Sequence, residues 1–308
     1  WMLANHAARE EDALIAETHS IADGQDAESV LRSVLKGFPL SKGRVAVGDT
    51  APSRVFGALQ GELPQAAFSI ASEFMDPLLA IKDEDALRRM RRAAEITDTI
   101  HPVVLDHIEV GRCVADLALE VDYQFRKYGA EDNSFQTGIV FTRPDGPPNS
   151  LDRRLAPGDS ITFDYGCIAE GYASDFGRSA FVGEPPAEYR QIHEIVLQSQ
   201  AAGMAAMKAG QITCAEADKV ARQVIEDAGY GPNFTHRLGH AIGIKVHEPP
   251  FLDGLDPTVL QAGMTFTVEP SIRVPGQSAN RVEDVVLVTE EGGEYLNHCA
   301  RDLHIVPD

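Results

Sequence analysis

The sequence is poor in cysteine, in aromatic residues and in positive charge. Its 308 residues include four cysteines and no C-x-x-C pair, which argues against a disulfide framework or zinc ribbon and favours a reducing, cytoplasmic location. No run approaches the roughly 18 apolar residues of a membrane-spanning helix, so an integral membrane protein is not expected. Lys and Arg total 27 against 47 Asp and Glu, and the net charge of -20 argues against binding to nucleic acid or to an anionic membrane surface.

The length and the 44% hydrophobic content predict a soluble protein of about two domains. Residues 1–80 read as a small α/β unit that resembles the later part of a domain whose beginning is missing. Residues 81–308 read as a second domain, which opens with a charged amphipathic helix. The predicted elements are helices over Glu10–Ile21, Ala27–Leu35, Pro52–Gln60 and Ile81–Ile100, and a strand over Arg44–Val47.

The second domain contains an internal repeat. The segment from Leu155 to Asp164 aligns with the segment from Leu260 to Glu269, at an offset of 105 residues, and each segment is a glycine turn followed by an apolar strand that ends on a carboxylate. Upstream, the stretch from Gly111 to Gly129 followed by Phe135 resembles that from Gly210 to Gly229 followed by Phe234. Two copies of a helix and strands indicate a pseudo-two-fold α+β domain.

Four carboxylates occupy related places in this repeat. Asp164 and Asp175 lie 11 residues apart around a turn at Gly171, so a hairpin would bring them to one face. Glu269 ends the repeat-related strand, and Glu283 lies in the strand pattern from Arg281 to Val288. Four buried carboxylates would repel one another, so the cluster requires either exposure or bound cations.

A histidine-rich segment supplies further candidates. His236, His240 and His247 occur within 12 positions among glycines, and Gly239 and Gly243 argue against a regular zinc-binding helix there. Two Asp, two Glu and His240 form an oxygen-rich ligand set that suits two divalent cations such as Mn²⁺, Co²⁺, Fe²⁺ or Zn²⁺. Such pairs of ions hydrolyse amides, so the ligand set predicts a metallohydrolase.

These motifs resemble those of the pita-bread metallopeptidases, which include prolidase, aminopeptidase P and the creatinase-type enzymes. The resemblance covers about Ile81 to Val306 and implies a pseudo-two-fold α+β catalytic domain, preceded by part of a creatinase-type N-terminal domain. It also implies a homodimer. The matching segments are Phe163–Gly166 with Ser174–Asp175, Gly239–Gly243, His247–Pro249, Val268–Pro270 and Arg281–Asp284.

The resemblance implies a role for each matched residue. Glu269 would be both a metal ligand and the proton acceptor, and His247 would contact the tetrahedral intermediate or the substrate. His236 would line the pocket, and Arg281 would bind a substrate carboxylate or orient the site. The implied metal ligands are Asp164, Asp175, His240, Glu269 and Glu283.

Three positions depart from the family pattern. A histidine is expected about 17 residues before the first ligand, where Pro147 or Asn149 stands, and no histidine occurs between His107 and His193. Asn149 could hydrogen-bond a substrate but could not shuttle a proton. Gly177 replaces the usual threonine after the second ligand, and the segment Ser271–Arg273 lacks the usual tyrosine.

Three functions follow, with Xaa-Pro hydrolysis as the first. The leading prediction is a dinuclear hydrolase of a peptide-like C–N bond in an Xaa-Pro dipeptide or N-terminus. The alternative is a non-peptidase relative that hydrolyses, or eliminates from, a small zwitterion such as ectoine. A catalytically silent metal-binding or partner-binding homologue is the third, and the complete set of five ligands speaks against it.

Overall fold

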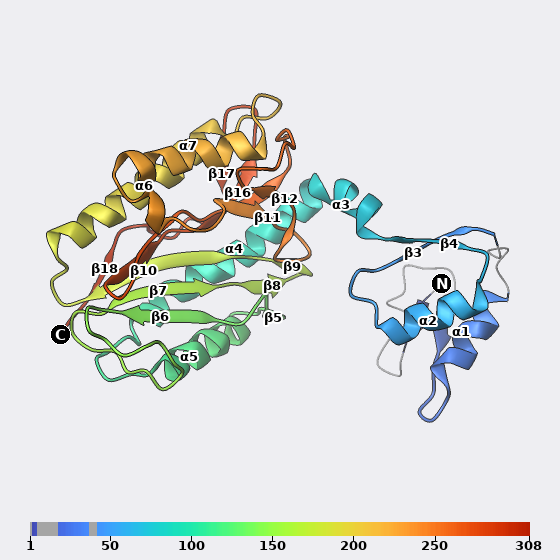
Figure 1. Ribbon diagram of the computed structural model, residues 1–308. Helices are drawn as coiled ribbons and strands as arrows, with labels where there is room; N and C mark the ends of the chain where they lie inside the picture. The colour runs from blue at the N-terminus through green and yellow to red at the C-terminus, as the bar shows by residue number, and fades with distance from the viewer. Residues whose placement is uncertain (1, 5–17, 37–41) are drawn as a thin grey trace. The chain divides into compact units, whose positions relative to one another are not determined.

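The computed structural model describes residues 2–4, 18–36 and 42–308 of the chain (Figure 1). It divides into two compact units, Trp1–Pro77 and Leu78–Asp308. The assignment of residues 1–80 to a creatinase-type N-terminal domain stays a prediction. Within the described ranges, no helix is both long enough and apolar enough to cross a lipid bilayer.

The first unit contains short helices and two parallel strand pairs. The predictions for Ala27–Leu35, Arg44–Val47 and Pro52–Gln60 are confirmed, and Asp26 caps the first of these helices by accepting from the N–H groups of Glu28 and Ser29. Of the predicted helix Glu10–Ile21, residues 10–17 lie outside the described residues, and the prediction is wrong for Thr18–Ser20, a strand. The elements are β1 Met2–Ala4, β2 Thr18–Ser20, α1 Ala27–Leu35, β3 Arg44–Val47, α2 Ser53–Glu62 and β4 Ala67–Ile70, followed by α3 Ser72–Ala80 at the boundary.

The predicted amphipathic helix is α4, which spans Glu84–Leu105 and so begins and ends later than expected. Its start is set by Asp83, whose carboxylate accepts from the Ala86 N–H at 2.8 Å. Met90, Ala94 and Ile96 are buried on its inner face, as their helical spacing predicts. The helix is therefore an integral part of the core of the second unit.

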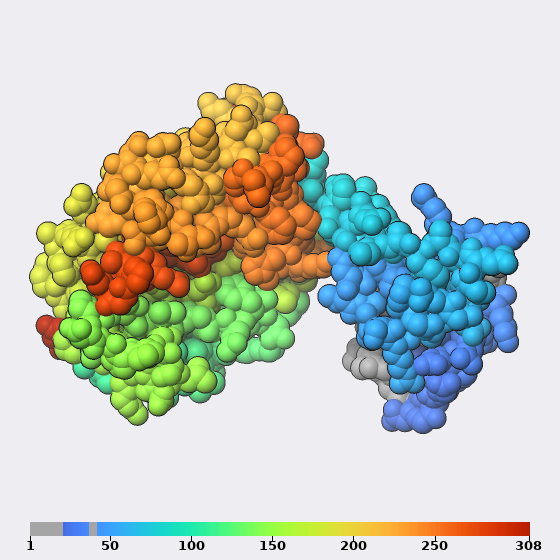
Figure 2. Space-filling model, viewed as in Figure 1, coloured from blue at the N-terminus to red at the C-terminus, as the bar shows by residue number. Residues whose placement is uncertain are grey.

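The second unit has two related halves. In the first half, α4 and α5 (Val114–Lys127) pack on the sheet of β18, β10, β7 and β6; in the second, α6 (Ala187–Ala206) and α7 (Cys214–Asp227) pack on the sheet of β12, β11, β13, β16 and β17. Helices α5 and α7 have 14 residues each, at the places where the repeat predicts related helices. In Figure 2 the two halves form separate contiguous areas of the surface, green and yellow to orange.

The strands of the second unit are short, and most belong to antiparallel pairs. The first half has β5 Asp132–Asn133, β6 Gly138–Thr142, β7 Ser160–Tyr165, β8 Cys167–Ala169, β9 Tyr172–Ala173 and β10 Phe176–Val182. After η2 (Gly231–Asn233), the second half has β11 Gly239–Ala241, β12 Glu248–Leu252, β13 Thr265–Val268, β14 Ser271–Val274, β15 Ser278–Arg281, β16 Asp284–Val288 and β17 Gly293–Tyr295, and β18 His304–Val306 returns to the first sheet.

The predicted continuous strand from Arg281 to Val288 is wrong at its beginning. Strand β15 ends at Arg281, and β16 starts at Asp284. Between them, Glu283 pairs with Gly177 of the other sheet in a single antiparallel bridge. The chain changes partner there because the two sheets meet at that point.

Candidate metal centre

The five predicted ligands come from strand ends that meet where the two sheets join. Asp164 lies in β7, and Asp175 directly precedes β10. His240 lies in β11, Glu269 directly follows β13, and Glu283 directly precedes β16. Antiparallel pairing of β7 with β10, and of β13 with β11 and β16, brings all five side chains to one cavity.

Gly177 makes the junction between the sheets possible. Its N–H donates to the Glu283 carbonyl at 3.2 Å, and the Glu283 N–H donates to the Gly177 carbonyl at 2.9 Å. A Cβ atom at residue 177 would lie 2.8 Å from Glu283 Oε2 and 2.9 Å from Arg281 Cδ. The absence of a side chain therefore lets Glu283 and Arg281 approach the first sheet closely.

His240 is oriented like a metal ligand. Its Nδ1–H donates to its neighbour's carbonyl, that of Ala241, at 3.1 Å, so its Nε2 carries a lone pair. That Nε2 lies 3.5 Å from Asp175 Oδ2 and 3.5 Å from Glu269 Oε1. A lone pair facing two carboxylates is unfavourable unless a cation lies between them, and a cation would satisfy all three groups.

The carboxylates have unused ligand capacity. Asp175, His240 and Glu283 each offer one atom, and these atoms lie within 4.8 Å of one another. All three residues are buried, and the Asp175 Oδ1 atom has no hydrogen-bond partner among the described residues. A buried unpartnered carboxylate oxygen is costly, so the residues present fit a divalent cation.

The electrostatics of the cluster support the same interpretation. Burial raises the pKa of Glu269 to about 7, although the Arg281 and His240 charges oppose the rise. Burial, followed by repulsion from neighbouring carboxylates, holds the pKa values of Asp175 and Glu283 well above their usual range. Without a cation the protein resists ionising these groups, and a bound cation would remove that penalty.

Arg281 provides positive charge inside the cluster. Its guanidinium contacts the carboxylate of Asp164 and lies 3.4 Å from Glu283 Oε2 and 3.6 Å from Glu269 Oε2. One guanidinium among three carboxylates orients their oxygen atoms but leaves the group of acids with excess negative charge. The structure therefore places Arg281 where it can orient the ligands.

Two histidines border the ligands in a cavity of about 450 Å³. The His247 side chain is exposed, and its ring centre lies 4.2 Å from that of His240. His236 donates from Nδ1 to the Arg237 carbonyl at 2.7 Å, and its Nε2 lies 2.5 Å from the Ser271 hydroxyl. Burial lowers the pKa of His236 to about 4, so its imidazole is neutral near pH 7.

Asn149 lies outside the set of described residues that line this cavity. Its amide accepts from the Phe141 N–H and donates to the Ile139 carbonyl, both at 3.1 Å. Both partners belong to β6, so the Asn149 side chain binds backbone at the edge of a strand. The structure brings together the other predicted site residues but not Asn149.

Two lining residues were missed by the sequence reasoning. Phe135 and Arg237 line the cavity beside the ligands. Arg237 stacks on the Phe251 ring, with its guanidinium carbon 4.4 Å from the ring centre. Phe135 belongs to the internal repeat, and Arg237 follows His236 directly. The sequence therefore indicates that both lie near the site but does not indicate that they line the cavity.

Comparison with known proteins identifies the family. Residues 88–290 match metallopeptidase family M24, and this segment includes all five ligand candidates. The chain belongs to this family. It is 37% identical over 222 residues to an uncharacterized peptidase of Staphylococcus aureus, and this match covers 71% of the chain. It is 35% identical over 238 residues to an Xaa-Pro dipeptidase of Pyrococcus furiosus, and this match covers 77% of the chain. The chain spans 62% of the length of the first of these M24 relatives and 68% of the second.

Solved peptidase structures confirm the predicted fold class. A dipeptidase of Pyrococcus horikoshii OT3 superposes with a TM-score of 0.87 at 31% identity, covering 94% of this chain and 81% of that one. An Xaa-Pro dipeptidase of Bacillus anthracis gives a TM-score of 0.87 at 30% identity, covering 99% and 86%. The resemblance to the pita-bread peptidases is thus confirmed.

Proposed function

We propose that this M24 protein is a dinuclear metal-dependent hydrolase that cleaves an Xaa-Pro dipeptide or an Xaa-Pro N-terminus. The observation that carries the proposal is the buried cluster in which His240 Nε2 faces Asp175 and Glu269. The names of the Pyrococcus furiosus and Bacillus anthracis relatives support the choice of substrate. Two ions are proposed because four carboxylates and one histidine suit a pair of divalent ions that share bridging carboxylates.

The proposed ions would be held by all five candidate ligands. When bound, divalent cations supply Lewis acidity, which lowers the pKa of water and polarises a carbonyl oxygen. The metal is proposed to be Mn²⁺, Co²⁺, Fe²⁺ or Zn²⁺, and the ligand chemistry suits each of them. The ligands are Asp164, Asp175, His240, Glu269 and Glu283.

The remaining tasks fall to side chains of the cavity. The Glu269 carboxylate faces the cavity beside the other ligands, where a carboxylate can accept a proton. His247 is exposed at the cavity and can donate a hydrogen bond to the substrate. Arg281 holds three carboxylates in place, and we assign it to orienting the site.

A small zwitterion remains the second candidate substrate. The family histidine is missing, and Asn149 bonds the backbone of β6 instead of lining the cavity. This change favours a relative that hydrolyses, or eliminates from, a compound such as ectoine. A panel of Xaa-Pro dipeptides, longer Xaa-Pro peptides and cyclic or guanidino zwitterions, assayed with Mn²⁺-loaded protein, separates the two candidates.

Metal content and turnover, measured together, test both enzymatic proposals against a catalytically silent homologue. Asp175→Asn should remove one metal equivalent and most turnover while leaving the fold intact, as measured by elemental analysis and circular dichroism. Asp132→Asn is the control, because Asp132 is exposed and pairs with Arg126 outside the cavity. Equal metal content and turnover in the two variants would refute the ligand role of Asp175.

We also propose that the protein is cytoplasmic and forms a homodimer. Light scattering tests the oligomeric state.

A further inference from the structure

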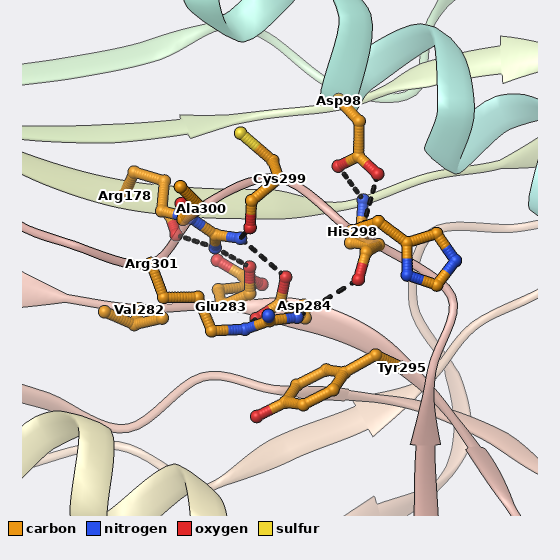
Figure 3. A network of polar contacts seen from close by, with 12 residues as sticks. Asp98, Arg178, Val282, Glu283, Asp284, Tyr295, His298, Cys299, Ala300 and Arg301 are labelled. Carbon is orange, nitrogen blue, oxygen red and sulfur yellow. Dashed lines mark hydrogen bonds and ion pairs between the residues drawn. The ribbon is translucent and has the colours of Figure 1, made fainter.

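Arg178 is a completely buried arginine whose every N–H group has an acceptor. It lies in β10, and its side chain is 2% exposed. Nε donates to the Ala300 carbonyl at 2.9 Å, and Nη1 donates to the carbonyls of Gly177 and Glu283, both at 2.8 Å. Nη2 donates to Asp284 Oδ1 at 2.7 Å and to the Cys299 carbonyl at 3.2 Å (Figure 3).

Asp284 extends the network towards the C-terminal segment. It is fully buried, and its Oδ2 accepts from Gln200 Nε2 and from Arg301 Nε, both at 2.9 Å. Arg301 also donates to the Asn297 carbonyl at 3.1 Å, and Asn297 Oδ1 accepts from the Val285 N–H at 2.9 Å. Segment Asn297–Arg301 is therefore bound to Asp284 and Val285, the two residues that follow Glu283.

This network holds the backbone of Glu283 rather than its carboxylate. The Glu283 carbonyl accepts from Arg178 and from the Gly177 N–H, and the Glu283 N–H donates back to Gly177. The Glu283 side chain points the other way, into the cavity that Asp175 and His240 line. Arg178 itself lies outside the described residues that line that cavity.

We propose that Arg178 is the positioning residue for Glu283, and that segment Asn297–Arg301 supports it. The five hydrogen bonds of the planar guanidinium fix the backbone of residue 283 between β15 and β16. They thereby fix the position of its carboxylate beside Asp175 and His240. Lysine could keep the charge beside Asp284 but could not make the same set of bonds. The inference rests on the proposed function, because it treats Glu283 as a metal ligand.

A matched pair elsewhere in the unit separates positioning from simple stability. Arg153 pairs with Asp159 at 2.7 Å, and the two side chains are 2% and 0% exposed. The Arg178–Asp284 pair has the same distance and the same exposures. Arg153 also lies outside the described residues that line the cavity of Glu283. Arg153→Lys is thus an appropriate control for Arg178→Lys.

The experiment measures Mn²⁺ affinity of the full chain by titration calorimetry, together with urea unfolding in chelator. Both lysine variants keep a cation beside the buried aspartate, and each should lose stability through the hydrogen bonds that lysine cannot make. The loss should be larger for Arg178→Lys, because Arg178 makes five such bonds and Arg153 two. Arg178→Lys should bind Mn²⁺ about tenfold or more weakly, within the range found when groups that orient ligands are removed. Arg153→Lys should stay within about twofold of the unchanged protein.

Equal Mn²⁺ affinities for the two variants would overturn the proposal. If Arg178→Lys fails to fold, Arg301→Gln replaces it, because Arg301 is 23% exposed and supports Asp284 from the other side. Arg301→Gln should weaken Mn²⁺ binding about threefold or more, and unchanged affinity would again overturn the proposal. If the unchanged protein itself binds no Mn²⁺, the proposed metal site fails, which is distinct from a failure of positioning.

Discussion

The substitution Glu269→Gln should stabilise the metal-free protein, and the increase in the free energy of unfolding should be larger at higher pH. Glu269 is 8% exposed, and burial raises its pKa from 4.5 to about 7. Between these values the unfolded chain has released the proton while the folded chain keeps it. The folded state therefore binds more protons, and a rise in pH across this interval favours unfolding.

The size of the effect follows from the two pKa values. The interval from 4.5 to about 7, at about 1.4 kcal/mol for each pH unit, corresponds to about 3 kcal/mol of lost stability at pH values above both. Just under 1 kcal/mol of this loss has already occurred by about pH 5. The stability advantage of Glu269→Gln should therefore increase by about 2 to 3 kcal/mol between about pH 5 and about pH 8.

The assay is urea unfolding of both proteins in chelator at several pH values. Burial lowers the pKa values of His236, His240 and His247, which makes the folded protein less stable towards acid. His236 and His247 occur in both proteins, so their contribution cancels in the difference to a first approximation. His240 lies 3.5 Å from Glu269 and does not cancel, but burial lowers its pKa, so its titration falls at the acid end of the range. A difference that stays constant or shrinks as the pH rises would refute the reasoning. Saturating Mn²⁺ at about pH 8 should reverse the order, because only Glu269 can ligate as an anion.

Three further outcomes are expected. Lys82→Met should lower the free energy of unfolding in urea by about 3 to 5 kcal/mol, because it leaves the buried Glu248 carboxylate without its partner. The Lys82 ammonium lies 3.3 Å from Glu248, and the two side chains are 3% and 8% exposed. Adding Glu248→Gln should recover more than half of the loss. Gly177→Ala should weaken Mn²⁺ binding about tenfold in calorimetry, since the new Cβ would stand 2.8 Å from Glu283 Oε2. Leu119→Asn, at a side chain 66% exposed, should change unfolding by less than about 0.5 kcal/mol and serves as a control for both.

The ligand-bearing strands could be predicted because their signals are local. A glycine turn, an apolar run and a terminal carboxylate recur at residues 155–164 and 260–269, and the structure has β7 and β13 at these places. The hairpin that brings Asp175 beside β7 likewise depends on a short turn, at Gly171 with φ of 77°. Patterns of this kind require no knowledge of partners far away in the chain.

Features that depend on distant partners were not predictable in this way. The break between β15 and β16 exists because Glu283 pairs with Gly177, and neither residue carries a local signal for that contact. The alternating pattern from Arg281 to Val288 therefore predicts one continuous strand where the structure has two. Two of the five acceptors of Arg178, the carbonyls of Cys299 and Ala300, likewise come from a distant segment, and a single arginine in a strand does not indicate them.

The position of Asn149 limits which side chains can move protons in this chain. Its amide is used by the backbone of β6, so it does not replace the family histidine in the cavity. His236 is occupied at both nitrogens, by the Arg237 carbonyl and the Ser271 hydroxyl. His247 is exposed beside His240, and the Glu269 carboxylate faces the same cavity, so we infer that proton transfer relies on these two residues. A substrate whose leaving group needs a third proton donor should then be a poor one, and small substrates that reach His247 directly should be better.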